Sequence, residues 1–351
     1  MPAARTRVNV LSVPVRYVFL GWMLALALAL LGRVASAADL SFVPWRVDYH
    51  FHLRSPAAYD ALVVMCKKYG DCTLPKPGIT TAKDAIAVLD EAGVQQAIVL
   101  SLGFYFGSPA AAAGHYDVAR MTRAENEYIA QQVAASSGRL IGFFSVDPLS
   151  SNALDEVRYW ARDGRLKGLK LHFANSQVNL LDPKQVEQVA DVVGLAGQSN
   201  LPMVIHLATS ADFSTAETES FIRDILPRAG NAWVQVAHSA MFGGEDKVNL
   251  NGLRAFADHM ARNDPATRHV MFDMSEAITP KTTAADAAAY VAVVRKIGVS
   301  RFLTGSDYNA NTPKWVDDMD RHLLPLTQGE WQTIARNCAP WVCAHQTQAE
   351  N

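Results

Sequence analysis

The sequence has few of the features that mark a nucleic-acid-binding or a disordered protein. Only 19% of its 351 residues are charged, no run of Lys or Arg occurs, and the formal net charge is −2. A mildly acidic chain of this kind is a poor partner for a phosphate backbone, so we exclude nucleic acid as a ligand. No Pro-, Gly- or Ser-rich linker divides the chain. Half of the residues are apolar, which favours one large folded core.

Cysteine is also scarce. The four cysteines fall as two close pairs, Cys66 with Cys72 and Cys338 with Cys343. Neither pair is accompanied by a second Cys-x-x-Cys or by histidines at zinc-finger spacing, which argues against structural zinc. In an exported protein, two local disulfides are the first expectation and free buried thiols are the alternative.

Acidic residues are missing from the first 37 positions. Arg5, Arg7 and Arg16 precede the apolar run at 18–32 (VFLGWMLALALALLG), which is followed by the small-x-small cleavage pattern at 35–37. The run is shorter than the roughly 20 residues that span a bilayer. We therefore predict that residues 1–37 are a signal peptide and that 38–351 form the mature chain, which is periplasmic or secreted. An uncleaved N-terminal anchor is the alternative, and it would be the only membrane contact.

Eight short apolar runs alternate with longer stretches of helical character. Near-continuous apolar runs indicate strands that are buried on both faces, as in a parallel sheet. Eight strand–helix alternations without a linker predict an α/β fold, namely a single-domain (β/α)8 TIM barrel. The predicted strands cover 46–52, 95–101, 140–146, 168–173, 202–208, 233–240, 269–275 and 301–307, and the predicted helices cover 81–92, 124–135, 152–163, 184–198, 215–228, 251–262, 284–297 and 328–337.

Polar residues gather at the ends of the predicted strands, where a barrel carries its active site. His50 and His52 share one face of the first strand with Asp48, because side chains alternate along a strand. A lone histidine on a strand is usually a packed core residue, but five of the ten histidines fall near strand ends. Imidazoles and a carboxylate suit a divalent metal ion. The other candidates at strand ends are Lys170, His172, His206, His238 and Asp307.

Not every candidate has the same role. We predict that His50, His52, His206 and Asp307 are metal ligands and that His238 has a functional role. For Lys170 the alternative is a buried barrel lysine that pairs with a carboxylate, because an unpaired buried ammonium is costly. Asp48 is expected to orient the first strand.

Five segments carry a resemblance to a known family. They are VDYHFH at 47–52, GLKLHF at 168–173, VIHLA at 204–208, VAHSA at 236–240 and LTGSDY at 303–308. With them the chain resembles the amidohydrolase superfamily, and within it the amidohydrolase-2 group, which includes aminocarboxymuconate semialdehyde decarboxylase, related aromatic-acid decarboxylases and various hydrolases. The resemblance covers residues 46–340 or so. It departs where many relatives have proline, at Phe173 and in 308–310.

The resemblance implies a mononuclear site with ligands that match His50, His52, His206 and Asp307, and an acid or base that matches His238. It implies one divalent ion, with zinc as the first expectation and manganese, iron or cobalt as alternatives. Lys170 and His172 would lie near the pocket and anchor substrate. In other branches of the superfamily a carbamylated lysine at the position of Lys170 bridges two ions. Barrels of this group often pair, so a homodimer is an expectation as well.

The expected function is metal-dependent hydrolysis of a C–N or C–O acyl bond in a small molecule, with Asp307 as the acid and base. His238 would stabilise the oxyanion or orient the water. Nonoxidative decarboxylation of an aromatic or enoic acid is the second hypothesis, and a non-catalytic metal-stabilised binding protein is the third. Lys170 favours an anionic substrate. The aromatic segment 103–107 favours an aromatic or cyclic substrate, unless it packs on the barrel rim. Four residues are placed near the pocket mouth: Arg54, Glu276, Tyr308 and Trp315.

Overall fold

The structure is a computed structural model that describes residues 43–68 and 78–343. The predicted signal segment 1–37 and Cys72, the predicted partner of Cys66, lie outside the described residues. Within the described part of the chain, none of the helices has the length and hydrophobicity needed to span a membrane.

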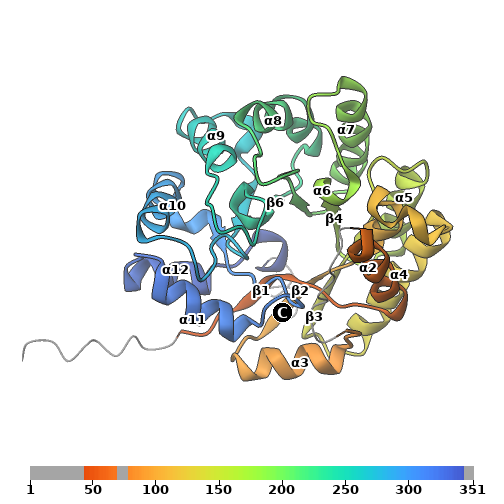
Figure 1. Ribbon diagram of the computed structural model, residues 1–351, viewed down its shortest axis with the longest axis horizontal. Coiled ribbons are helices and arrows are strands. Elements are labelled where there is room, and N and C mark those ends of the chain that lie inside the picture. The colour runs from red at the N-terminus through yellow and green to blue at the C-terminus, as the bar shows by residue number, and fades with distance from the viewer. Residues whose placement is uncertain (1–42, 69–77, 344–351) are drawn as a thin grey trace, which may run out of the picture. The chain divides into compact units, whose positions relative to one another are not determined.

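Eight parallel strands form one sheet in the order in which they occur in the sequence, which confirms the predicted barrel. The last strand meets the first through the Asp307 N–H, which donates to the His50 carbonyl (2.8 Å), and the Tyr49 N–H, which donates to the Thr304 carbonyl (2.9 Å). Figure 1 shows the strands at the centre with helices around them. The strands are β1 (Val47–Phe51), β2 (Gln96–Leu100), β3 (Leu140–Ser145), β4 (Gly168–His172), β5 (Met203–His206), β6 (Val234–Val236), β7 (Val270–Asp273) and β8 (Phe302–Leu303).

Helices follow the strands much as the hydrophobic pattern predicts, but the structure has two further long helices. The prediction missed α2, which follows β1, and α11, which follows β8. The predicted helix 215–228 is instead the short α8, a π-helical turn at Phe221–Ile225 and a 3-10 turn at Leu226–Ala229. The helices are α2 (Pro56–Lys68), α3 (Ala82–Glu91), α4 (Val118–Ala134), α5 (Ala153–Asp163), α6 (Phe173–Ser176), α7 (Pro183–Gln198), α8 (Thr215–Ser220), α9 (Asn251–Ala261), α10 (Ala284–Ile297), α11 (Pro313–Leu323) and α12 (Gln328–Arg336).

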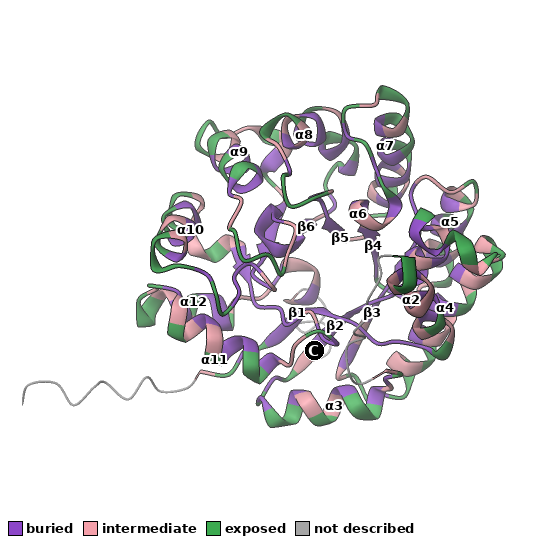
Figure 2. Cartoon of the chain, in the orientation of Figure 1, coloured by how far each residue is buried: buried purple, intermediate pink, exposed green. Residues whose placement is uncertain are grey.

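The strands are buried on both sides, as their continuous apolar character predicts. Figure 2 shows the buried strands inside a ring of helices whose outer faces are exposed. One apolar cluster fills the space between strands and helices, and a smaller one lies inside the barrel around Tyr49, Leu100 and Phe143. Side chains that fill the barrel interior leave the ends of the strands as the place for polar groups.

The C-terminal segment packs against the interior cluster. The Ala339 N–H donates a hydrogen bond to the Tyr49 hydroxyl (2.8 Å), and Trp341 packs edge-on against the Tyr49 ring. Cys338 and Cys343 are joined by a disulfide across a Cα–Cα distance of 6.0 Å, as predicted for this pair. The disulfide closes the turn that carries Trp341 into this position.

Candidate metal centre and active site

The ends of β1 and β8 bring three of the predicted ligands together. His50, His52 and Asp307 each offer one ligand atom, and these atoms lie within 4.8 Å of one another. Asp307 Oδ1 is 3.5 Å from His50 Nε2 and 3.3 Å from His52 Nε2. The period of two along β1 puts both imidazoles on the inner face, and the register between β8 and β1 sets Asp307 beside them.

Hydrogen bonds fix which nitrogen of each β1 histidine faces Asp307. His52 Nδ1 donates to the Leu100 carbonyl (2.7 Å), and His50 Nδ1 donates to Asp273 Oδ2 (3.1 Å). In the neutral rings the proton is therefore on Nδ1, and Nε2 keeps a lone pair. Burial, with the nearby Lys170 ammonium as the second cause, lowers the pKa of His50 to about 4, so this ring is neutral at pH 7.

His206, at the end of β5, has a buried nitrogen without a partner. Its Nε2 has no hydrogen bond to any described residue, although the atom is buried. Burial and the neighbouring histidines hold the pKa of His206 well below its ordinary value, so the ring is neutral, and the tautomer with its proton on Nδ1 has an Nε2 lone pair that can bind a cation. His206 is not within 4.8 Å of the three-residue set, but its ring centroid lies 4.8 Å from that of His238. Three imidazoles and one carboxylate with these properties fit a divalent ion.

Asp273 links the histidines, and sequence reasoning missed it. This fully buried carboxylate ends β7 and accepts hydrogen bonds from His50 Nδ1, Gln235 Nε2 (2.6 Å) and the His238 N–H (3.0 Å). Ser275 donates a further bond to it through Oγ (2.6 Å), and the Ser275 carbonyl accepts from His238 Nδ1 (2.8 Å). Asp273 and Ser275 therefore set the orientation of one predicted ligand and of the predicted acid or base.

We expect Asp273→Asn to weaken metal binding by about 10–100-fold, because the amide group cannot accept all of these hydrogen bonds and His50 loses its orientation. The dissociation constant is measured by competition with a chromophoric chelator. Asp258→Asn is the matched control, since Asp258 forms an exposed ion pair with Lys296. An unchanged dissociation constant in the folded Asp273 variant would contradict the positioning role.

Three residues of the site have a left-handed backbone conformation. His238, Glu276 and Asp307 have φ angles of 52°, 49° and 55°. Such conformations are uncommon for residues other than glycine, and they concentrate at functional sites. Gly243 approaches closely, since a Cβ at this position would be 3.0 Å from His238 Cγ. The left-handed turns direct these side chains from the ends of β6, β7 and β8 into one space, where His238, Glu276 and Asp307 form a second set of groups within 4.8 Å.

The two candidates on β4 have different surroundings. Lys170 is fully buried, and its Nζ lies 3.3 Å from His50 Nε2. Burial lowers the pKa of Lys170 to about 8. His172 stacks on His206 with a centroid distance of 3.9 Å, and its Nδ1 accepts a hydrogen bond from the Asn175 N–H (3.3 Å) at the start of α6. His172 therefore supports the His206 ring and caps a short helix. Asp48 accepts from Ser306 Oγ (2.5 Å) and holds β8 to β1.

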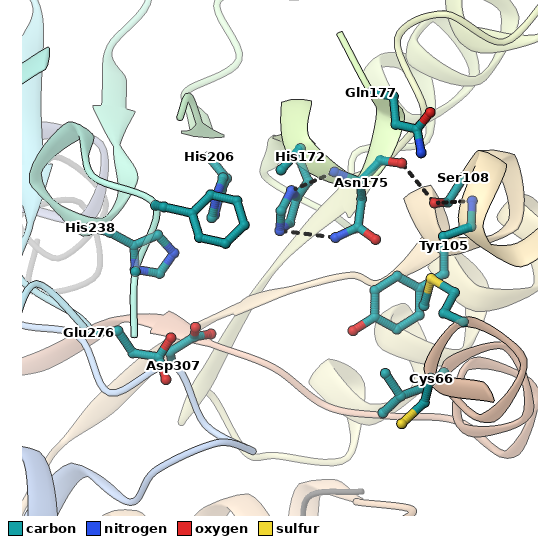
Figure 3. Close-up of a pocket in the computed structure, with 16 residues that line it drawn as sticks. Cys66, Tyr105, Ser108, His172, Asn175, Gln177, His206, His238, Glu276 and Asp307 are labelled. Carbon is teal, nitrogen blue, oxygen red and sulfur yellow. Dashed lines mark hydrogen bonds between the residues drawn. The ribbon is translucent and has the colours of Figure 1, made fainter. Parts of the chain in front are cut away.

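A cavity of about 580 Å³ opens beside these groups. His172, His206, His238 and Asp307 line it together with Glu276, as Figure 3 shows. The aromatic segment after β2 contributes Tyr105. Of the other residues placed near the mouth, Arg54 and Tyr308 are buried outside the lining and Trp315 is exposed on α11. A cavity of this size holds a small molecule.

A (β/α)8 barrel with converging imidazoles and a carboxylate at the C-terminal ends of its strands has the architecture of a metal-dependent enzyme. The chain belongs to the amidohydrolase family, whose model matches residues 47–335. No curated protein matches the chain.

Solved structures share this fold at low sequence identity. The 5-carboxyvanillate decarboxylase of Novosphingobium aromaticivorans, in complex with manganese and 4-hydroxy-3-methoxy-5-nitrobenzoic acid, has a TM-score of 0.55 and 15% identity over 88% of this chain and 98% of its own. The 2,6-dihydroxybenzoate decarboxylase of Rhizobium has a TM-score of 0.57 and 11% identity over 88% and 100%. A probable 2-pyrone-4,6-dicarboxylic acid hydrolase of Acinetobacter baumannii has a TM-score of 0.52 and 14% identity over 84% and 96%.

Proposed function

We propose that this chain is a hydrolase that binds one divalent metal ion and cleaves a C–N or C–O acyl bond of a small molecule. The observation that carries the proposal is the pair of Nε2 lone pairs on His50 and His52 beside the Asp307 carboxylate, together with the buried, partnerless Nε2 of His206. We propose His50, His52, His206 and Asp307 as the residues that hold the ion. Zinc, manganese, iron and cobalt all suit this donor set.

A bound divalent ion would supply Lewis acidity toward the substrate carbonyl and toward water. The remaining chemistry falls to the side chains. Asp307 is placed to take the proton of the attacking water and to pass it to the leaving group. His238 donates its Nδ1 proton to the Ser275 carbonyl, so its Nε2 can accept a hydrogen bond from water or, once protonated, donate one to the developing oxyanion.

The charge of the cavity favours an acyl substrate over a carboxylate substrate. Among the described residues that line it, none is lysine or arginine, whereas Glu276 and Asp307 both carry carboxyl groups. Burial, together with the Asp307 carboxylate, raises the pKa of Glu276 to about 9, because two charged carboxylates side by side are unfavourable here. A neutral amide, ester or lactone enters such a site without that cost.

Decarboxylation of an aromatic acid is the second candidate. The aromatic side chains of Tyr105 and Phe242 in the cavity lining favour an aromatic substrate. The buried Lys170, whose Nζ lies 3.3 Å from His50 Nε2, favours an anionic one. The fold is also shared with decarboxylases of hydroxylated aromatic acids.

One assay separates the two reactions. The metal-loaded protein is incubated with a panel of aryl amides, aryl esters and lactones and with a panel of aromatic acids, and acid release and carbon dioxide are both measured. Hydrolysis is expected to release one carboxylic acid per turnover from the first panel, without carbon dioxide. Carbon dioxide from the second panel alone would replace hydrolysis with decarboxylation. Turnover of neither panel would contradict both reactions.

A further inference from the structure

The polar groups on the cavity wall opposite the proposed metal ligands are all neutral. Tyr105 and Ser108 come from the segment after β2, and Asn175 and Gln177 come from the segment after β4. Figure 3 shows these residues on one side of the cavity, and His206, His238, Glu276 and Asp307 on the other. Within residues 43–68 and 78–343, every ionisable carboxyl group of the lining is therefore at the end where the reaction is proposed to take place.

Tyr105 presents a hydroxyl that the protein does not use. Its Oη makes no hydrogen bond with any described residue, while its ring packs edge-on against Phe104 at a centroid distance of 5.0 Å. Figure 3 shows the hydroxyl directed into the cavity, on the side that faces Asp307. Burial raises the pKa of Tyr105 to about 12, so the group is a hydrogen-bond donor at neutral pH. A positioned ring with an unused donor suits recognition of a ligand, because little side-chain freedom remains to be lost.

Hydrogen bonds hold this wall in place relative to the metal ligands. Ser108 Oγ donates to the Asn175 carbonyl (2.7 Å), and the Ser108 N–H donates to the Tyr105 carbonyl (3.1 Å). The Asn175 N–H in turn donates to His172, whose ring stacks on His206. A continuous path therefore joins the Tyr105 segment to one of the proposed ligands, which fixes the separation of the two ends of the cavity.

The Asn175 Nδ2 lies 3.1 Å from His172 Nε2, so its Oδ1 is the atom that remains for a ligand. We propose that Tyr105, together with this Asn175 oxygen, binds the end of the substrate remote from the reacting carbonyl, and that this end is a neutral hydroxyl group, which can accept from Tyr105 and donate to Asn175, or a carbonyl group, which accepts from Tyr105 alone. The inference rests on the proposed function, because it takes the reacting end to lie at His206, His238 and Asp307. The substrate class is then a ring-containing acyl compound with one neutral polar substituent. The described lining offers a second carboxylate no lysine or arginine, and Arg54 acts on Tyr105 only from outside the lining. We therefore expect a dicarboxylate to lose hydration at this wall without forming an ion pair.

Calorimetric binding of small acids to the manganese-loaded full chain tests the inference without turnover. The probes are benzoate, 3- and 4-hydroxybenzoate, and the 1,3- and 1,4-benzenedicarboxylates. We expect the better hydroxybenzoate to bind about tenfold more tightly than benzoate, as one added hydrogen bond implies. The dicarboxylates should bind no more tightly than benzoate. Tyr105→Phe should remove the hydroxybenzoate gain and leave benzoate affinity within about twofold.

Two further variants complete the experiment. Tyr116→Phe is the matched control, since Tyr116 packs against Phe106 after the same strand and is outside the cavity lining. Asn175→Ala should reduce the same gain, which keeps the inference testable if the Tyr105 variant does not fold. A hydroxybenzoate gain that survives both substitutions, or a preference for a dicarboxylate, would overturn this inference alone. Failure of the wild-type protein to bind any of the five acids would overturn this inference, whereas the proposed hydrolysis is tested separately by the assay with neutral amides, esters and lactones.

Discussion

His206→Asn is expected to remove the bound metal ion and to lower kcat/KM by at least about 10³-fold, since metal catalysis accounts for several kcal/mol of barrier and about 1.4 kcal/mol is a factor of ten. The physical reason is that His206 Nε2 is buried without a hydrogen-bond partner among the described residues. Such an atom costs free energy in the empty site and recovers it when it binds a cation. Metal content per chain is measured by elemental mass spectrometry on protein that was purified without chelator.

The same variant separates a ligand from a structural histidine. The quantity that separates the two roles is the change in stability on adding metal, because the substitution also removes the packing of the His206 ring against His172. At a metal concentration of about 1,000 times Kd, the wild-type protein should gain about 4 kcal/mol and the variant should gain little. His322→Asn is the control, since His322 is exposed on α11. A His206 variant that keeps one ion per chain and full activity would show that His206 is not a ligand.

His238→Asn is expected to lower kcat/KM by about 10²–10⁴-fold while the metal content stays the same, as is typical when an acid or base is removed. Asparagine is the suitable replacement for two reasons. The backbone of His238 is left-handed (φ 52°), which asparagine tolerates better than alanine. The amide can also donate to the Ser275 carbonyl in place of Nδ1, so the turn after β6 should persist.

The result with His238→Asn distinguishes three roles. Loss of activity with retained metal supports the acid or base role. Loss of both would make His238 a ligand, consistent with its position within 4.8 Å of Glu276 and Asp307. Activity within about threefold of wild type would contradict any chemical role, since proton transfer by a positioned side chain contributes far more than this. The exposed His322→Asn variant serves as the control here as well.

The sequence determined the barrel and the principal histidines by itself. Eight buried runs predict eight parallel strands, because only strands covered on both faces are apolar throughout. The period of two along β1 puts His50 and His52 on one face, and this follows from local geometry. His206, His238 and Asp307 were predicted at the ends of three other strands, where the structure has them around one cavity. The ends of parallel strands meet at one rim, whatever the details of packing.

Only the tertiary structure decided which residues orient these side chains and which segments form the opposite wall of the cavity. Asp273 gave no signal in the sequence, because a single carboxylate at the end of a strand gains its role from His50 and Gln235, which are 223 and 38 residues away. The left-handed turns at His238, Glu276 and Asp307 are imposed by the surrounding packing and not by glycine. The sequence pattern does not predict the α2 helix after β1, and it allows the aromatic segment 103–107 to be either a pocket wall or part of the barrel rim. The contact of Ser108 with Asn175 fixes that segment as a cavity wall, and such a contact between distant loops depends on the closed barrel rather than on local sequence.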